Sequence, residues 1–114
     1  MKLENAKAQM RKGVLEYCIL SLTLNKEMYS SDIISSLKEA ELIVVEGTLY
    51  PLLTRLKNAG LLTYRWEESK SGPPRKYYGI TDSGKKFLEE LDTTWANLVQ
   101  AVNKTTNKNQ NKDD

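Results

Sequence analysis

The feature that most constrains the fold is one stretch, residues 47–80, in which a strongly patterned helix is followed at once by two alternating segments. The helix is marked by four leucines at helical spacing, Leu49, Leu52, Leu53 and Leu56. This spacing predicts a helix over residues 46–59, which Gly60 ends in a left-handed conformation. If Gly47 or Thr48 caps it, Pro51 lies in the first turn, where its missing N–H is tolerated.

Two alternating segments after Gly60 predict a β-hairpin. Residues 62–66 and 75–80 alternate apolar and polar side chains, and residues 69–74 between them are dense in turn formers. The loop carries Lys70, and Arg75 and Lys76 follow it. We therefore expect a hairpin with a long, basic loop.

Two further helices are predicted before this stretch. The apolar face of the first consists of Val14, Leu15, Cys18, Ile19 and Leu22. After a turn at residues 25–27, Ser30 or Ser31 is expected to cap a second helix whose apolar face is Ile33, Ile34 and Leu37. Residues 42–45 are β-branched and apolar, too few for a helix, and predict an extended connector.

A fourth helix is expected to open at Thr81, with Asp82 at its positive end. Its apolar residues step by three and four, forming a seam of Leu88, Leu91, Trp95, Leu98 and Val102. Such a seam is typical of helix pairing, although it also suits an intramolecular core face. Because the chain from residue 104 to Asp114 has no apolar residue, we expect a disordered polar tail there.

The composition excludes most enzymes and leaves no expected metal or cofactor. The chain has no histidine, so a Ser-His-Asp triad and a His-ligated metal site are impossible. The single Cys18 permits no internal disulfide, which indicates a reducing compartment, most simply the cytoplasm. The longest apolar stretch, residues 15–24, is too short and too often interrupted to span a membrane.

Three helices followed by a hairpin predict a winged helix-turn-helix, a mainly α fold with a small β-hairpin, here extended by a C-terminal helix. In that fold the helix over 46–59 enters the major groove and the hairpin, the wing, reaches the adjacent backbone. The net charge is only +2, but basic side chains cluster in residues 1–12 and 69–78. Thr54 and Asn58 on the polar side of the helix either face DNA or only keep a surface helix soluble.

The chain resembles the PadR-like family of bacterial transcriptional regulators. The resemblance is carried by the run GTLYPLLTRLKNAGLL at residues 47–62 and by RKYYGITDSG at residues 75–84, and it extends over about residues 8–102. The short fourth helix is similar to that of the small branch that includes multidrug-sensing repressors. The resemblance implies a homodimer that represses a promoter until an effector is sensed. The implied partner is double-stranded operator DNA with an inverted repeat.

The residues expected to contact this DNA come from the second and third helices and from the wing: Ser30, Ser31, Thr48, Tyr50, Arg55, Lys57, Lys70, Arg75 and Lys76. The seam is expected to form the dimer interface. The resemblance further implies that a small aromatic ligand stacks on Trp95, in a pocket lined by Met10, Val14, Tyr17, Leu91, Leu98 and Val99. Trp95 equally suits a dimer core that binds nothing.

These expectations divide the chain into a winged helix-turn-helix domain at residues 1–81, a dimerisation helix at 82–103 and a tail at 104–114. The alternative function is a winged helix that docks a partner protein through Trp66 and exposed tyrosines instead of binding DNA.

Overall fold

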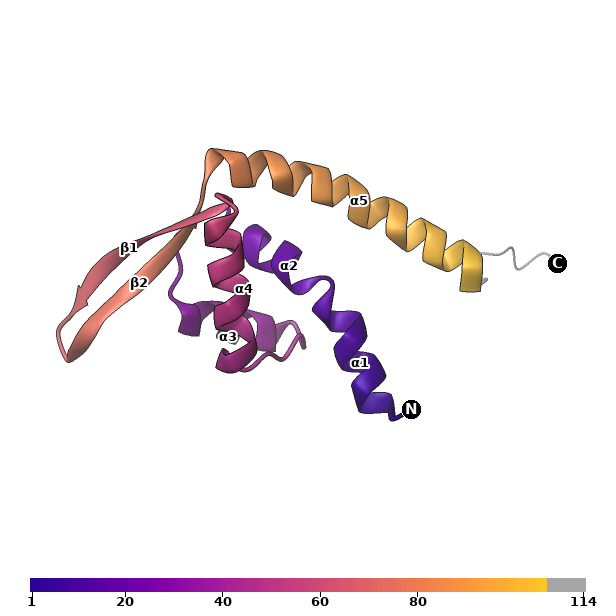
Figure 1. Cartoon of the computed structure of the whole chain (residues 1–114), viewed down its shortest axis with the longest axis horizontal. Helices are drawn as coiled ribbons and strands as arrows, with labels where there is room; N and C mark the ends of the chain where they lie inside the picture. Colours follow the sequence, from indigo (N-terminus) through magenta and orange to yellow (C-terminus); the bar gives the residue numbers. More distant parts are fainter. Residues whose placement is uncertain (107–114) are drawn as a thin grey trace.

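The computed structural model describes residues 1–106, which form five helices and a two-stranded antiparallel hairpin (Figure 1). In chain order the elements are α1 (Leu3–Lys12), α2 (Leu15–Leu22), α3 (Ser30–Glu39), α4 (Glu46–Asn58), β1 (Leu62–Ser69), β2 (Gly72–Ile80) and α5 (Asp82–Thr106). Helices α2 to α4 followed by the hairpin are the arrangement of a winged helix-turn-helix. The predicted fold class is therefore confirmed, with α5 as the additional C-terminal helix.

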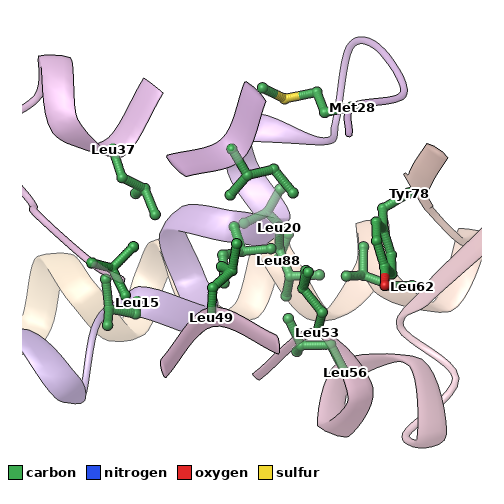
Figure 2. Packing of buried hydrophobic residues seen from close by; sticks show 13 residues of the cluster. Leu15, Leu20, Met28, Leu37, Leu49, Leu53, Leu56, Leu62, Tyr78 and Leu88 are labelled. Atoms are coloured by element: carbon green, nitrogen blue, oxygen red, sulfur yellow. The ribbon is translucent and has the colours of Figure 1, made fainter. Parts of the chain in front are cut away.

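One apolar core joins α2 to α5 and the hairpin (Figure 2). It consists of Leu15, Ile19, Leu20, Met28, Ile33, Leu37, Val44, Leu49, Leu53, Leu56, Leu62, Tyr78 and Leu88. Helix α4 supplies Leu49, Leu53 and Leu56, while Leu52 is half-buried. Full burial of each such side chain stabilises the fold by about 1.5–3 kcal/mol. The leucine side of α4 thus faces inward, which leaves its polar side exposed.

The first predicted helix is in fact two. Helix α1 ends at Gly13, and α2 begins after Val14, whose N–H donates to the Arg11 carbonyl. Glycine weakens a helix at this point because it loses more conformational freedom on folding than any other residue. Within the described part of the chain, α1 has no buried side chain. The apolar face predicted for a single helix therefore belongs mainly to α2.

Helix α3 begins one residue earlier than the serine caps predict. Tyr29 is the extended residue before the helix, and its N–H donates to the Asp32 carboxylate at 3.1 Å. Ser30 is the first helical residue, so neither Ser30 nor Ser31 is the cap. An aspartate at the third helical position replaces the serine hydroxyl as the group that satisfies a free N–H.

Helix α4 begins at Glu46, the start of the predicted range, but its cap is Val45 and not Gly47 or Thr48. Pro51 therefore lies in its second turn and not in its first. Proline has no N–H to donate to the carbonyl of Gly47 four residues before it. The burial of three leucines on the same helix compensates for this loss. At the other end, Gly60 has φ of +79°, the predicted left-handed stop.

The hairpin, called the wing below, has longer strands and a shorter turn than predicted. Leu62 pairs with Ile80, and the register continues to Ser69 opposite Gly72, so only residues 70 and 71 form the turn. Near this tip the register shifts by one, and Pro73 and Pro74 lie opposite Glu68. Residues 69–74 therefore belong mostly to the strands. Met28 exchanges two backbone hydrogen bonds with Tyr78, which attaches the wing to the start of α3.

Thr81 caps α5 as predicted. Its Oγ1 accepts a hydrogen bond from the Gly84 N–H at 2.9 Å and donates one to the Gly60 carbonyl at 2.7 Å. Gly84 packs so closely that a Cβ there would lie 2.6 Å from Ile80 Cγ1 and would overlap the Leu61 carbonyl oxygen. The helix continues to Thr106, so residues 104–106 of the expected tail are helical; residues 107–114 lie outside the described residues.

The two terminal helices project from the core (Figure 1). The molecule measures 63 × 34 × 22 Å, and its radius of gyration is 16.9 Å. A compact domain of this size has a radius of gyration of about 13 Å. The excess arises because α1 and the C-terminal half of α5 extend away from the other elements.

Candidate nucleic-acid interface

A groove of about 450 Å³ lies between the start of α3, the polar side of α4 and the wing. We call it the wing groove. Its lining consists of Tyr29, Ser30, Ser31, Tyr50, Thr54, Trp66, Pro74, Arg75, Lys76 and Tyr78. Five of the nine residues predicted to contact DNA meet here, although they come from three separate segments of the chain. Hydroxyl groups and cations thus converge on one concave surface.

The helical side of the wing groove is held by contacts between α3 and α4. Ser30 Oγ and the Tyr50 hydroxyl lie 3.1 Å apart, which fixes the tyrosine against the first turn of α3. Thr54 is one turn further along α4 and is exposed, as is Asn58. The polar side of α4 therefore faces outward, as the leucine spacing predicts.

The wing side of the groove is aromatic and basic. Because side chains alternate along a strand, Tyr64, Trp66, Lys76 and Tyr78 share one face of the hairpin. Lys76 Nζ lies 4.4 Å from the centre of the Tyr64 ring and 5.3 Å from that of Trp66. The indole of Trp66 is 60% exposed. Lys76 is thus held over aromatic faces while its ammonium group remains available to an anion.

The opposite face of the wing carries a stack of four side chains. The Tyr29 and Tyr77 rings are stacked with centres 3.7 Å apart, Arg75 lies over Tyr29 at 5.2 Å, and Arg65 lies over Tyr77 at 4.8 Å. This stack joins the wing to the residue that precedes α3. It also positions the Arg75 guanidinium beside the wing groove.

The cations of the wing differ in their ion pairs. Arg65 Nε lies 2.8 Å from a Glu27 carboxylate oxygen, and its guanidinium also bonds Glu67. These hydrogen bonds raise the pKa of Arg65 above its usual range. Within residues 1–106, Arg75 and Lys76 form no ion pair. The positive charge of Arg75 and Lys76 beside the groove is therefore free to bind an anion, as is that of Lys70 at the wing tip.

Four of the predicted DNA contacts lie outside the wing groove. Thr48 faces a different hollow, beside α1, and Lys70 is in the turn at the wing tip. Lys57 is exposed, with its Nζ 5.9 Å from the Tyr64 ring centre. Arg55 lies toward α2, where its Nε is 3.5 Å from a Glu16 carboxylate oxygen. The sequence periodicity distinguishes exposed from buried residues. It could not show that these four residues lie outside the wing groove, because all four are exposed.

Five groove residues are not among the nine predicted DNA contacts: Tyr29, Thr54, Trp66, Pro74 and Tyr78. Of these, only Thr54 was considered from the sequence as a residue that could face DNA. The alternation that predicts the strands also places Trp66 on the same face as Lys76, so this signal could have identified it. Tyr29 and Pro74 reach the groove only because Met28 pairs with Tyr78 and the strands extend to the wing tip. Neither contact has a marker in the local sequence.

A second hollow, of about 500 Å³ and predominantly apolar, lies between α1 and the C-terminal half of α5. We call it the terminal hollow. It is lined by Met10, Arg11, Gly13, Val14, Trp95, Leu98, Val99, Val102 and Asn103. Five of the seven predicted effector residues are among them. Tyr17 and Leu91 instead line a smaller neighbouring hollow between α2, α4 and α5, although the Tyr17 ring lies 6.3 Å from that of Trp95.

The predicted dimer seam divides into a buried and an exposed part. Leu88 is buried in the core of its own chain and Leu91 packs against that core, so the intramolecular interpretation applies to this end of the seam. Trp95, Leu98 and Val102 are 42%, 50% and 49% exposed. The seam residues available to a partner are therefore the last three.

The structure places Cys18 half-buried on α2, where burial raises the pKa of its thiol. A raised pKa disfavours the reactive thiolate.

Among residues 1–106, no group of three or more acidic, cysteine or histidine side chains is arranged to hold a metal ion. None of the helices in this part of the chain is both long and apolar enough to cross a lipid bilayer.

Comparisons with known proteins agree on one family. Residues 19–90 match the model of the transcriptional regulator PadR-like family. A PadR-like transcription factor from Bacteroides fragilis has 61% sequence identity and a TM-score of 0.75, over 89% of this chain and 98% of that one. A PadR family transcriptional regulator from Eggerthella lenta has 32% identity and a TM-score of 0.85, over 96% and 94% of the two chains.

A curated relative from Bacillus subtilis, the negative transcriptional regulator PadR, is 36% identical over 81 residues. The match covers 68% of this chain but only 44% of that protein, so the chain spans less than half the length of this relative. These similar proteins are transcriptional regulators and not enzymes.

Proposed function

Since the chain belongs to the PadR-like family of transcriptional regulators, we propose that it is a homodimeric repressor that binds an inverted repeat in operator DNA. The family is one of DNA-binding regulators. Dimerisation and release by an aromatic effector have separate support, from the two projecting helices and from the terminal hollow. We place the protein in the cytoplasm, with the DNA on which it acts.

The observation that carries DNA binding is the wing groove, where hydroxyl groups of α3 and α4 face two cations that have no ion pair within residues 1–106. In the proposed complex α4 lies in the major groove with Tyr50 and Thr54 toward base edges and phosphates. Ser30 and Ser31, in the first turn of α3, lie where a helix N-terminus favours a phosphate. Arg75 and Lys76 contact the neighbouring backbone, which positions the protein without reading sequence.

A salt titration tests this assignment. The native protein is footprinted on its own promoter region, and its affinity for the protected site is measured over a range of salt concentrations. Replacing Arg75 and Lys76 by Ala should reduce the salt slope by roughly 4 for a dimer, because four phosphate contacts are lost. The matched control replaces Lys85 and Lys86 of α5, which are exposed and outside the groove, and should leave the slope unchanged.

Two outcomes of this titration contradict the proposal. An unchanged slope in the groove variant would remove the wing from the DNA interface. If the native protein protects no promoter DNA at low salt, the winged helix is instead a protein-docking module, the alternative that the sequence leaves open.

Dimerisation is supported by the two projecting helices. Helix α1 has exposed Leu3 and Met10, and α5 has exposed Trp95, Leu98 and Val102. Apolar surface of this extent favours association, and a twofold pair of such helices would bury it in a self-complementary interface. In sedimentation analysis we expect twice the 13.0 kDa chain mass. Leu98→Glu should lower this mass to that of a monomer, whereas the control Asn97→Glu should retain the dimer.

An effector site is supported by the terminal hollow, which joins both projecting helices. Its Trp95 offers a flat, polarisable face, a surface on which planar aromatic compounds stack. The described lining contains Arg11 and no carboxylate, which suits neutral or anionic compounds better than cations. Ligand binding at this position would agree with placing the protein in the multidrug-regulator-like branch. The ligand would act on the helices that hold the dimer together.

A further inference from the structure

Two consecutive residues of α2 contact two different helices. Glu16 is paired with Arg55 of α4, with Oε2 and Nε 3.5 Å apart. The Tyr17 hydroxyl donates a hydrogen bond to Asp92 Oδ1 of α5 at 2.5 Å. Helix α2 therefore connects the helix proposed to enter the major groove with the helix proposed to form the dimer.

The hydrogen bond to Asp92 lies between the core-packed part of α5 and its exposed part. Before it, Leu88 and Leu91 pack on the core; after it, Trp95, Leu98 and Val102 are exposed. Within residues 1–106, Asp92 is the one α5 side chain that hydrogen-bonds to another element. The hydrogen bond thus marks the point where the helix leaves the rest of the molecule.

In a dimer held by the exposed half of α5, a change in the angle of α5 at this point would change the separation of the two α4 helices. Dimeric helix-turn-helix proteins place their recognition helices about 34 Å apart, so each lies about 17 Å from the twofold axis. A rotation of about 5° at a hinge near the axis moves each recognition helix by about 1.5 Å, so the separation of the twofold pair changes by about 3 Å. This change is close to the rise of one base pair, about 3.4 Å.

We infer that Tyr17 is a positioning residue which, through its hydrogen bond to Asp92, sets the half-site spacing that the dimer selects. This inference rests on the proposed function, because it requires both a dimer and operator DNA. Tyr17 itself does not contact the DNA. Its hydroxyl holds α5 at one angle, and the dimer in turn holds two α4 helices at one separation.

A series of operators with altered spacers tests this role. An inverted repeat is first selected from random DNA with the native protein, and duplexes are then made with one or two base pairs added to or removed from its centre. The native protein should lose about tenfold in affinity when one base pair is added or removed, comparable to a mismatched base pair. Tyr17→Phe should bind the best operator within about threefold of the native protein but lose less than about threefold on changing the spacer.

Variants at Asp92 separate this role from a general loss of stability. Asp92→Asn retains an oxygen that accepts the phenol hydrogen bond and should keep the native spacing preference. Asp92→Ala should behave as Tyr17→Phe does, and the double variant should be no more permissive than either single one, because all three lack the same bond. Each variant is also measured by sedimentation, and only variants that remain dimeric are compared.

The inference is overturned if Tyr17→Phe, as a folded dimer, keeps the native preference, or if native protein binds all spacings equally. If the native protein selects no DNA at all, the proposed function itself fails. The two failures are therefore distinguishable in the first binding experiment.

Discussion

The Arg55 guanidinium lies 3.5 Å from the Glu16 carboxylate, on the side of α4 that faces α2 and not the wing groove. The sequence predicts a DNA contact for Arg55, but the structure gives this side chain an intramolecular partner. The guanidinium is 76% exposed, so the ion pair itself contributes little stability. Its location distinguishes it from Lys76, which has aromatic neighbours and a position beside the groove.

We therefore predict that Arg55→Gln and Lys76→Gln differ in their effect on DNA binding. Lys76→Gln should weaken binding to all sequences and reduce the salt slope by about 1 per protomer. Arg55→Gln should leave the slope nearly unchanged, because no phosphate contact is lost. Both variants are titrated against the same operator at several salt concentrations. If Arg55→Gln reduces the salt slope as much as Lys76→Gln does, Arg55 contacts the DNA after all.

A second prediction concerns ligand binding beside Trp95. The chain has only two tryptophans, so Trp66→Phe leaves Trp95 as the single indole fluorophore. Titration of this variant with 2-naphthoate should quench its emission in a saturable manner, and the cationic 2-naphthylmethylammonium should quench less, because Arg11 lines the hollow.

The matched control is Trp95→Phe, in which the remaining indole, Trp66, reports the wing groove. This variant should show no saturable quenching by 2-naphthoate. If both variants respond alike, the terminal hollow is not the ligand site, and Trp95 only packs against neighbouring side chains.

The close approach of Gly84 to Leu61, between α4 and β1, leads to a prediction about stability. A Cβ at Gly84 would overlap the Leu61 carbonyl and crowd Ile80. Gly84→Ala should therefore destabilise the fold by about 1–3 kcal/mol, even though alanine favours a helix.

Gly47→Ala is the matched control for this substitution. Gly47 is also helical, but a Cβ there would meet nothing within 4 Å. It should stabilise the fold by up to about 1 kcal/mol. Both variants are compared with the native protein by urea unfolding, and a stabilising Gly84→Ala would disprove the close contact.

The phenol of Tyr17 should show a distinct pH dependence. The hydrogen bond to Asp92, and then burial, raises the pKa of Tyr17 above the ordinary tyrosine value. Because the pKa is higher in the folded than in the unfolded chain, the interaction contributes fully below the ordinary pKa. It is lost as the pH rises through the higher, folded value.

Ultraviolet absorbance titration checks this expectation. The difference between the native protein and Tyr17→Phe isolates the ionisation of this one phenol. It should occur above about pH 10, the ordinary value for tyrosine. The opposite result, ionisation below that pH, would mean that the hydrogen bond does not form in solution.

Much of the fold could be predicted because the strongest signals are local. Four leucines at helical spacing fixed the inward side of α4, and Gly60 adopts the left-handed conformation expected of it. The strand alternation found the hairpin, and Thr81 caps α5 as its position before Asp82 suggested. Each of these features depends on residues close together in the chain.

The features that sequence reasoning missed depend on tertiary contacts. Tyr29 caps α3 because Asp32 returns to its N–H, and Met28 pairs with a strand 50 residues later. The burial of Leu88 distinguishes core from interface, which a repeated apolar spacing alone cannot do. For the same reason, the candidate site was predicted only in part. Local spacing in the sequence predicts whether a polar residue is exposed, but the direction in which its side chain points depends on tertiary packing.

The two prolines near the wing tip have a consequence for solubility. A two-stranded hairpin has open edges, and such edges can pair with other chains to form aggregates. Pro73 and Pro74 remove two N–H groups from β2, and Met28 covers the same strand near Tyr78. Along β1, Arg65 and Glu67 add charge. The wing can therefore remain exposed to DNA while resisting edge-to-edge association with the wings of other molecules.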